Sequence, residues 1–298
     1  MPAADNGRQG LVICADKGLY HVESLDGVFL CSARGALRNA DLAPLVGDRV
    51  LLDDKVISTI LPRRNSLIRP PLANLDALVF VVSTCSPSPN YLLLDKFIAI
   101  CRFKGIEPML ALTKLDLADY AQLCEIYSAT DIRIFNIDYS APEPAAELIK
   151  ALSGRFSAFT GNSGVGKSTL LNAIDAGFDI PTGEISRKLG RGRHTTRRTM
   201  LYKLPDGGYI ADTPGFSTFD TNRYDIIRKE ELAECFGEFE QYIGKCRFSD
   251  CSHTAESGCE IIAAVERGEI NRSRYESYRT MYEQAKQLKE WEIAPRKQ

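Results

Sequence analysis

Hydrophobic positions in the first 62 residues come in short runs, which is typical of β-strands. Segments rich in glycine and aspartate, such as 16–18 and 25–27, separate these runs and predict turns. The five runs cover residues 10–14, 19–22, 27–31, 47–52 and 56–61. Five short strands in about 60 residues predict a small barrel of the OB-fold type, although an SH3-like barrel has nearly the same pattern.

From Asp76 the pattern changes to an alternation of strands and helices. Residues 77–83 form a continuous apolar run of the kind that is buried on both faces of a parallel sheet. Asn90 is suited to cap a helix that ends at Gly105. Further strands are predicted over 109–112, 132–137, 155–160 and 209–211, and helices near 119–128, after Pro142 and over 169–174. This alternation predicts a central α/β domain with helices on both faces of its sheet.

After about residue 223 the sequence is polar, contains cysteines and favours helices. The last helix is predicted near 272–290, with a stripe that we expect to pack inside the protein rather than stack on RNA: Tyr275, Tyr278, Tyr282, Ala285 and Leu288. The changes of pattern predict three domains, a barrel over 1–65, an α/β domain over 66–222 and a helical domain over 223–298.

Composition is that of a soluble globular protein. The chain has 298 residues, of which 44% are hydrophobic and 26% charged, so collagen, global disorder and coiled coil are excluded. The longest strongly apolar run, 77–82, is far below the roughly 20 residues that span a bilayer. No secretory signal is visible at the start, and nine cysteines, an odd count, fit a reducing compartment, so we expect a cytoplasmic protein. The net charge of −2 gives no argument of its own for nucleic acid.

The strongest motif is a phosphate loop at residues 161–168, which matches G-x4-G-K-S/T without departure. Its glycines let successive backbone N–H groups point at phosphate oxygens, while Lys167 can reach the β- and γ-phosphates. The Ser168 hydroxyl can bind Mg²⁺, and a strand before and a helix after supply the required context. The nucleotide-binding residues predicted here are Gly161, Asn162, Ser163, Gly164, Val165, Gly166, Lys167, Ser168 and Thr169.

Two further motifs indicate which kind of nucleotide binds. Asp212-Thr213-Pro214-Gly215 follows an apolar strand, so Asp212 can hold Mg²⁺ through water and the Gly215 N–H can bond a γ-phosphate. Residues 113–116, Thr-Lys-Leu-Asp, end an earlier strand and predict guanine recognition by Thr113, Lys114 and Asp116. The Asp116 carboxylate would accept from two N–H donors of guanine, and adenine lacks both donors, so ATP is disfavoured.

The order of these motifs differs from that of Ras-like chains, because the guanine motif here precedes the phosphate loop. A circular permutation explains this order, since chain termini often lie close together and a sheet can be reopened elsewhere. On this interpretation Ser140-Ala141 is the second contact to the base.

Residues 185–199 are strongly basic and contain no acidic residue, which favours contact with phosphate, from RNA rather than from the nucleotide. The cations are Arg187, Lys188, Arg191, Arg193, Arg197 and Arg198. Either Thr195 or Thr196 would bind Mg²⁺ in the triphosphate state. Phe216 stands where Ras-type enzymes place a water-orienting Gln, which predicts slow intrinsic hydrolysis. His194 is the candidate catalytic group, and an exposed loop histidine without a role is the alternative.

A second kind of site is predicted near the C-terminus, where three thiols and one imidazole occur within fourteen residues: Cys246, Cys251, His253 and Cys259. Sulfur and nitrogen ligands in a closed set of four suit one structural Zn²⁺ rather than a catalytic one. Unrelated buried thiols are the alternative, as expected for the scattered Cys14, Cys31, Cys85, Cys101 and Cys124.

The motif order from Thr-Lys-Leu-Asp to the C-x4-C-x-H-x5-C cluster resembles that of the RsgA family of circularly permuted GTPases. The likeness covers nearly the whole chain, including Gly47-Asp48-Arg49-Val50 in a stretch like the family's OB domain. It implies a GTP phosphohydrolase that binds the 30S ribosomal subunit and its 16S rRNA and assists late 30S maturation. It also implies that the subunit stimulates turnover, that Mg²⁺ accompanies GTP, and that GDP is the product. We expect a monomer that binds no membrane.

Two other classes of function are open at this stage. A P-loop phosphotransferase acting on a small molecule is one, and guanine selection by Asp116 argues against it. An RNA-binding module with a vestigial nucleotide site is the other, and the intact Lys167, Ser168 and Asp212 argue against that.

Overall fold

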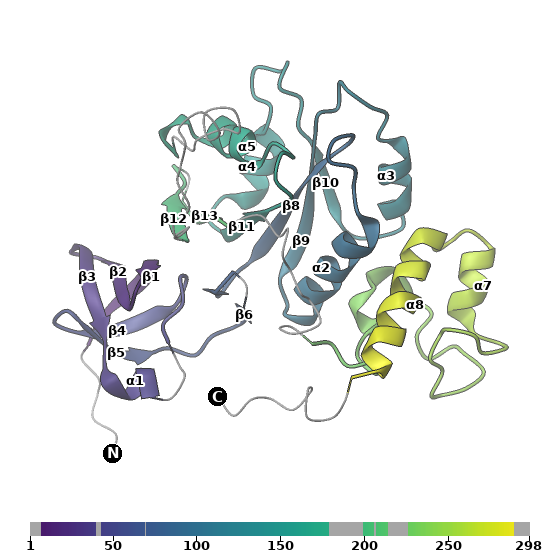
Figure 1. Cartoon of the computed structure of the whole chain (residues 1–298), viewed down its shortest axis with the longest axis horizontal. Coiled ribbons are helices and arrows are strands. Elements are labelled where there is room, and N and C mark those ends of the chain that lie inside the picture. Colours follow the sequence, from purple (N-terminus) through teal and green to yellow (C-terminus); the bar gives the residue numbers. More distant parts are fainter. Residues whose placement is uncertain are drawn as a thin grey trace.

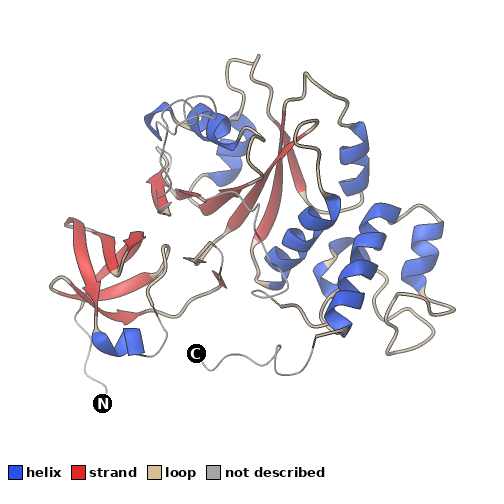
Figure 2. Ribbon diagram, viewed as in Figure 1, coloured by secondary structure: helices blue, strands red, loops and turns tan. Residues whose placement is uncertain are grey.

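The computed structural model describes residues 7–39, 43–68, 70–178, 199–205, 207–213 and 226–288, without the side chains of residues 38, 39 and 176. A small barrel, a central α/β part and a helical C-terminal part follow one another across Figure 1. Figure 2 shows that the strands lie in the first two parts and that helices make up the regular structure of the third.

The barrel is built from five strands, which are β1 (Arg8–Asp16), β2 (Leu19–Ser24), β3 (Gly27–Ala33), β4 (Arg49–Asp53) and β5 (Val56–Ile60). A short helix, α1 (Gly35–Asn39), follows β3. The strands pair in the order β1-β2-β3-β5-β4, and β4 returns to pair with β1, which closes the barrel. Val12, Val22, Val50 and Ile57 fill its interior, since the alternate positions of each strand point inward. The predicted N-terminal barrel is confirmed.

The central sheet has the order β10-β9-β8-β11-β13-β12, in which β12 is antiparallel to β13 and the other pairs are parallel. Its strands are β8 (Ala77–Ser83), β9 (Glu107–Thr113), β10 (Arg133–Asn136), β11 (Phe156–Thr160), β12 (Met200–Lys203) and β13 (Tyr209–Asp212). The helices are α2 (Tyr91–Phe103), α3 (Ala121–Tyr127), α4 (Ala146–Leu152), α5 (Lys167–Ile174) and the 3-10 turn η1 (Ala176–Phe178). A two-stranded ribbon, β6 (Ser66–Leu67) with β7 (Leu72–Ala73), precedes this sheet.

Helices cover both faces of the central sheet, as its apolar strands require. The even-numbered side chains of β8, such as Phe80, pack in one cluster with α2 and α3. The odd-numbered ones, such as Val79, pack in another cluster with α4 and α5. All seven residues of β8 are buried, so the continuous apolar run from Ala77 to Ser83 forms the strand that the sequence predicts.

The barrel and the central sheet are joined through β1 and β12, which pair where Cys14 meets Met200. The carboxylate of Glu23 on β2 accepts from Lys203 Nζ at 3.2 Å and from the Tyr209 hydroxyl. Burial would raise the pKa of Glu23, but the hydrogen bond from Tyr209 outweighs it and lowers that pKa. The sequence pattern does not predict β12, which is only four residues long. The pairing makes one eleven-stranded sheet of the two parts.

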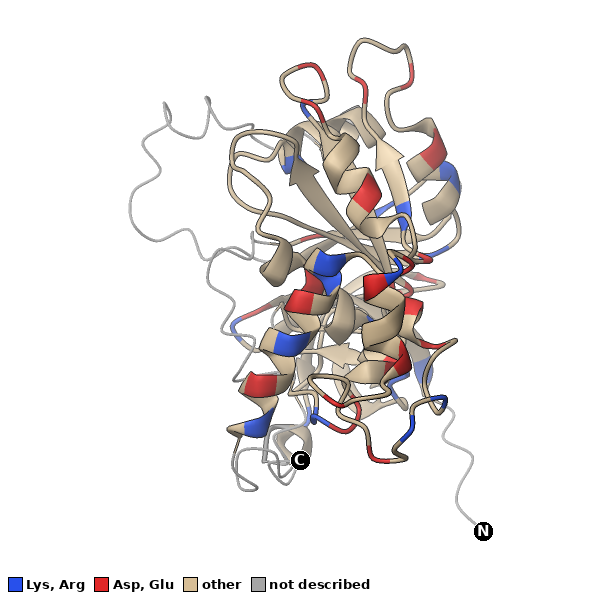
Figure 3. Cartoon of the chain, turned by 90° about the vertical axis from the view of Figure 1, so that its right-hand side faces the viewer, with Lys and Arg blue, Asp and Glu red and all other residues tan. Residues whose placement is uncertain are grey.

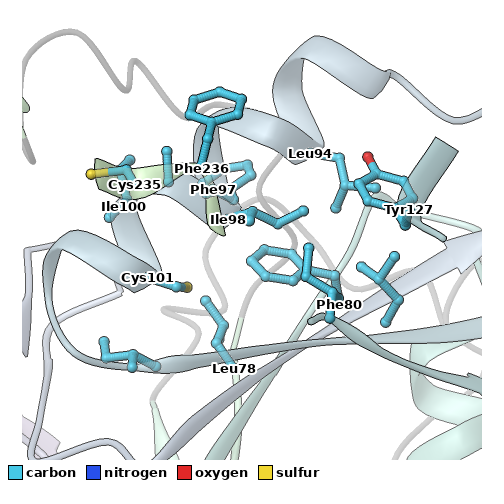
Figure 4. Packing of buried hydrophobic residues seen from close by; sticks show 14 of the residues in the cluster. Leu78, Phe80, Leu94, Phe97, Ile98, Ile100, Cys101, Tyr127, Cys235 and Phe236 are labelled. Atoms are coloured by element: carbon cyan, nitrogen blue, oxygen red, sulfur yellow. The ribbon is translucent and has the colours of Figure 1, made fainter. Parts of the chain in front are cut away.

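The C-terminal part packs against α2. Its elements are the 3-10 turns η2 (Ala233–Cys235) and η3 (Gly237–Phe239) and the helices α7 (Glu260–Glu266) and α8 (Arg272–Lys286). Figure 4 shows Cys235 and Phe236 beside Phe97 and Ile100 of α2, in the cluster that also includes β8. Tyr278 of α8 stacks edge-on against Phe236, and Tyr275 is also buried, so these two residues of the predicted stripe pack inside the protein. Across the described part of the chain, every helix is too short or too polar to cross a membrane.

A buried ion network crosses the same contact. Arg274 of α8 donates from Nη1 to Asp95 Oδ1 of α2 at 2.5 Å. It also donates to both oxygens of Glu238, at 2.7 Å and 3.1 Å. Tyr127 of α3 donates to Asp95 at 2.9 Å. Because the ionic side chains are at most 2% exposed, this network fixes α8 against α2.

Candidate active site and metal centre

The phosphate loop lies between the end of β11 and the start of α5, as its motif requires. Gly164 and Gly166 adopt φ of 84° and 94°, values that favour glycine. Lys167 and Ser168 are the first two residues of α5, so the positive end of that helix faces the loop. This arrangement suits a polyphosphate held by backbone N–H groups.

The guanine motif meets the phosphate loop, although 52 residues separate them in the chain. The Thr113 hydroxyl at the end of β9 donates to the Val165 carbonyl at 2.6 Å. Lys114 follows with a φ of 59°, and its carbonyl accepts from the Leu117 N–H at 3.1 Å, which closes a turn. Asp116 lies in this turn and is exposed. The two motifs therefore meet in space although the guanine motif comes first in the chain, as the predicted permutation requires.

Asp212 also reaches the phosphate loop. It ends β13, next to β11 in the sheet, and its carboxylate forms an ion pair with the ammonium of Lys167. The next residue, Thr213, is buried, and its hydroxyl donates to the Phe159 carbonyl at 2.6 Å. Lys167 thus has Ser168 next to it in the chain and Asp212 next to it in space, an arrangement that suits oxygen donors around one Mg²⁺.

Ser140 and Ala141 lie in a turn beyond β10, the strand next to β9. The N–H and hydroxyl of Ser140 donate to Asp138 Oδ1 at 2.9 Å and 2.6 Å, and these bonds lower the pKa of Asp138. Because β9 and β10 are parallel, this turn and the Asp116 turn share one edge of the sheet. That position is compatible with the predicted second base contact.

Several predicted site residues lie outside the described residues. They are Gly215, His194, Thr195 and Thr196, together with Phe216 and the six cations of segment 185–199.

The four predicted metal ligands come together. Their ligand atoms all lie within 4.8 Å of one another. His253 Nδ1 is 3.5 Å from the sulfur of Cys246 and 3.5 Å from that of Cys259, and the two sulfurs are 3.8 Å apart. A tetrahedral zinc with bonds of about 2.3 Å to sulfur and about 2.0 Å to nitrogen requires edges of roughly 3.8 Å and 3.5 Å. The residues present therefore fit Zn²⁺, and Cys235 lies outside the cluster.

The electrostatics of the cluster make its thiolates depend on a nearby cation. Burial raises the pKa of Cys251 to about 12 and lowers the pKa of His253, which favours the neutral imidazole. Buried thiolates need a cation beside them, and a neutral imidazole is the form that binds zinc.

Glu256 organises the loop that carries these ligands. Its carboxylate accepts from the N–H groups of Ser252 at 2.8 Å, Thr254 at 3.0 Å and Ala255 at 3.1 Å, and from the Ser252 hydroxyl. Burial alone would raise the pKa of Glu256, but these hydrogen bonds outweigh it and lower that pKa to about 2. His253, inside the loop, has a φ of 58°, which Glu256 helps to hold.

Three groups that hold these sites in place are not predicted from the sequence pattern. Glu256 is one, and its four-residue spacing from Ser252 was a usable signal. Arg274 is another, for which nothing in the local sequence indicates burial. The third is the polar segment 84–90, which follows β8 and contacts the guanine motif.

Known proteins resemble this chain over both the barrel and the α/β part. The profile of the RsgA GTPase family matches residues 60–222, and that of the RsgA N-terminal domain matches residues 9–56. Curated relatives named "Small ribosomal subunit biogenesis GTPase RsgA" include one from Moorella thermoacetica, 41% identical over 91% of this chain and 95% of its own length. One from Enterococcus faecalis is 42% identical over 91% and 93%.

Two solved structures are similar throughout. The crystal structure of YjeQ from Thermotoga maritima has a TM-score of 0.77 at 34% identity and covers 95% of this chain and 99% of its own. The structure of YloQ, described as a circularly permuted GTPase, has a TM-score of 0.74 at 31% identity and covers 96% and 97%. These likenesses extend over the barrel, the α/β part and the C-terminal part.

Proposed function

Because the chain belongs to the RsgA GTPase family, we propose that it acts in the biogenesis of the small ribosomal subunit. It hydrolyses GTP, as that family does. On the subunit it assists late maturation of the 30S particle, and contact with the particle and its 16S rRNA stimulates hydrolysis. This role would place it in the cytoplasm, where we expect it to act as a monomer. Family membership favours the GTPase over a small-molecule phosphotransferase.

One observation supports the nucleotide assignment most directly, the hydrogen bond from Thr113 to the Val165 carbonyl. It sets the guanine motif against the phosphate loop, so one bound nucleotide could touch both. In this proposal Asp116 reads the guanine, Lys114 lies along the ring, and Ser140 and Ala141 form the second base contact. The phosphates lie on the N–H groups of residues 161–169.

The triphosphate end of the site combines residues from three segments. Lys167 neutralises the β- and γ-phosphates. Ser168, with Thr195 or Thr196, would bind the Mg²⁺ that accompanies GTP, and Asp212 would hold that ion through water. The Gly215 N–H bonds the γ-phosphate. His194 is proposed to orient the attacking water, because Phe216 cannot. The Lys167–Asp212 ion pair supports the shared roles of Lys167 and Asp212, since it brings the phosphate loop and the end of β13 within reach of one nucleotide.

The cysteine cluster is proposed to hold one structural Zn²⁺. Cys246, Cys251, His253 and Cys259 supply all four ligands, which leaves no position for a substrate. When bound, the ion supplies a crosslink between the ligand loop and the start of α7.

We place the boundary between the barrel and the α/β domain at 65/66, and the boundary between the α/β domain and the helical domain at 222/223.

Contact with RNA is proposed for the basic segment 185–199 together with the barrel and the zinc region. Lysines and arginines alternate with acidic residues along α8 in Figure 3, so that helix lacks the one-sided charge of a phosphate-binding surface among its described residues. The segment with six cations and no acidic residue is then the stronger candidate for phosphate contact.

The proposal is tested by GTP turnover of the full chain with and without purified 30S subunits, with ATP as the competing nucleotide. We expect strong stimulation that is confined to GTP. Thr113→Val serves as a matched variant, because it removes the hydroxyl that joins the two motifs and should weaken GTP binding. GTP turnover that 30S subunits leave unchanged would overturn the ribosomal part, and equal use of ATP would overturn the guanine site.

A further inference from the structure

The segment from Thr84 to Asn90 connects β8 to α2 and lies between the guanine motif and the phosphate loop. The Thr84 N–H donates to the Thr113 carbonyl at 3.2 Å, which continues the pairing of β8 with β9 by one residue. Pro87 lies beside Gly164 of the phosphate loop. The segment thus contacts both halves of the proposed nucleotide site, although neither motif includes it.

Thr84 holds the backbone of the guanine motif. Its hydroxyl donates to the Lys114 carbonyl at 2.7 Å. The same carbonyl accepts from the Leu117 N–H at 3.1 Å and so closes the turn that contains Asp116. Lys114 has a φ of 59°, in the left-handed region, where a residue with a side chain is strained and needs a contact that holds it there.

The side chain of Lys114 is held from the same segment. Its ammonium donates to the Ser86 carbonyl, two residues after Thr84. The segment therefore fixes Lys114 at its backbone and at the end of its side chain. The exposed Asp116 carboxylate follows two residues later, in a turn whose first carbonyl is the one that Thr84 bonds. A shift of that carbonyl turns the direction in which Asp116 points.

We propose that Thr84 is a positioning residue for guanine selection, which acts by fixing the turn from Lys114 to Leu117 that presents Asp116. This inference rests on the proposed function, in which Asp116 accepts from two N–H donors of guanine. A carboxylate reads both donors only when its two oxygens are aligned with them. Inosine nucleotides keep the ring N–H but lack the amino group, so they depend less on this alignment.

The test compares two substitutions of Thr84 in the full chain. Thr84→Val keeps the branched shape and removes the hydroxyl, and the Lys114 carbonyl still accepts from Leu117. Thr84→Ser keeps the hydroxyl. Ser88→Ala is the matched control, because Ser88 lies in the same segment and its hydroxyl bonds the Cys85 carbonyl at 3.1 Å, away from the guanine motif. Dissociation constants are measured for GDP, IDP and ADP by displacement of a fluorescent GDP.

We expect Thr84→Val to weaken GDP binding by about tenfold and IDP binding by less than about threefold, since one hydrogen bond contributes roughly this much to an equilibrium. Thr84→Ser and Ser88→Ala should stay within about threefold of the parent chain for both nucleotides. Unchanged GDP binding in Thr84→Val would overturn the inference. Equal weakening of GDP and IDP would also overturn it, because general damage to the pocket affects both.

Asp116→Ala separates a failure of this inference from a failure of the guanine site itself. If Asp116 reads guanine, its removal should abolish the preference of GDP over IDP. If Asp116→Ala leaves that preference intact, or if the parent chain binds ADP as tightly as GDP, the guanine assignment fails whatever Thr84 does. If Asp116→Ala abolishes the preference and Thr84→Val does not reduce it, the role of Thr84 alone is wrong.

Discussion

Replacing Arg274 by methionine measures how strongly the buried ion network holds α8 on α2. The arginine side chain is 1% exposed, and it faces the carboxylates of Asp95 and Glu238, which are 0% and 2% exposed. Methionine keeps much of the packing but removes the cation that forms an ion pair with Asp95 and with Glu238. Removal of one partner from a buried ion pair costs about 3–5 kcal/mol, and each 1.4 kcal/mol is about a factor of ten in an equilibrium.

Hydrogen exchange of the α8 and α2 amides in the full chain reports this local stability without the assumption that all three parts unfold together. We expect Arg274→Met to lower their protection by about 100- to 4,000-fold at pH 7. Arg272→Met is the matched control, because Arg272 lies on the same helix and is exposed. In Arg272→Met the protection of the α8 and α2 amides should change by less than about threefold, because surface substitutions usually have small effects on stability.

The loss of protection in Arg274→Met should become smaller as the pH falls. Burial raises the pKa of Asp95, and Arg274 is the main group that opposes this rise. Without Arg274 the pKa of Asp95 rises further above its unfolded value. A carboxyl group of that kind gains folded-state stability as pH falls through its folded pKa, so the variant should approach the parent chain as the pH is lowered from 7. A loss of protection below about tenfold at pH 7, or one that grows at pH 5, would refute the reasoning.

Three further changes have defined outcomes. Glu256→Gln should lower zinc affinity in a chelator competition by about 10- to 100-fold, because the charged carboxylate organises the ligand loop, and unchanged affinity would contradict this role. Asp116→Asn should exchange the preference for GDP for one for XDP in a displacement assay, because an amide N–H can donate to the extra carbonyl of xanthine, and a retained GDP preference would argue against guanine reading. Gly208→Ala should lower the melting temperature by several degrees, because a Cβ there lies 2.5 Å from the Arg155 carbonyl oxygen. Gly207→Ala, with a similar φ of 85° but open space, should lower it by less.

Much of the fold could be predicted from local sequence. The run 77–83 forms β8 with the predicted bounds, since a strand buried on both faces is apolar at every position. Asn90 caps α2 as expected and accepts from the Leu93 N–H at 3.0 Å. The phosphate loop and the Cys–His cluster could be predicted because each is a local motif whose spacing carries the chemistry.

Features that depend on distant partners could not be predicted. The strand β12 has only four residues, and its place in the sheet is set by β13 on one side and by β1, far away in the chain, on the other. Arg274 lies 36 residues from Glu238 and 179 residues from Asp95, so an arginine of ordinary appearance is buried by contacts that no local pattern contains. Thr84 is similar, because the carbonyl that it bonds lies 30 residues further along the chain.

The continuous sheet has a consequence for how the molecule meets a large partner. Because β1 pairs with β12, and Glu23 bonds both Lys203 and Tyr209, the barrel is held on the nucleotide-binding part by contacts beyond the connecting chain. When a particle binds the barrel, the surface of the nucleotide-binding part is therefore already oriented toward it. Little freedom between the barrel and that part remains to be lost on docking. The second contact then forms at a high effective concentration, so two weak surfaces can act as one strong one.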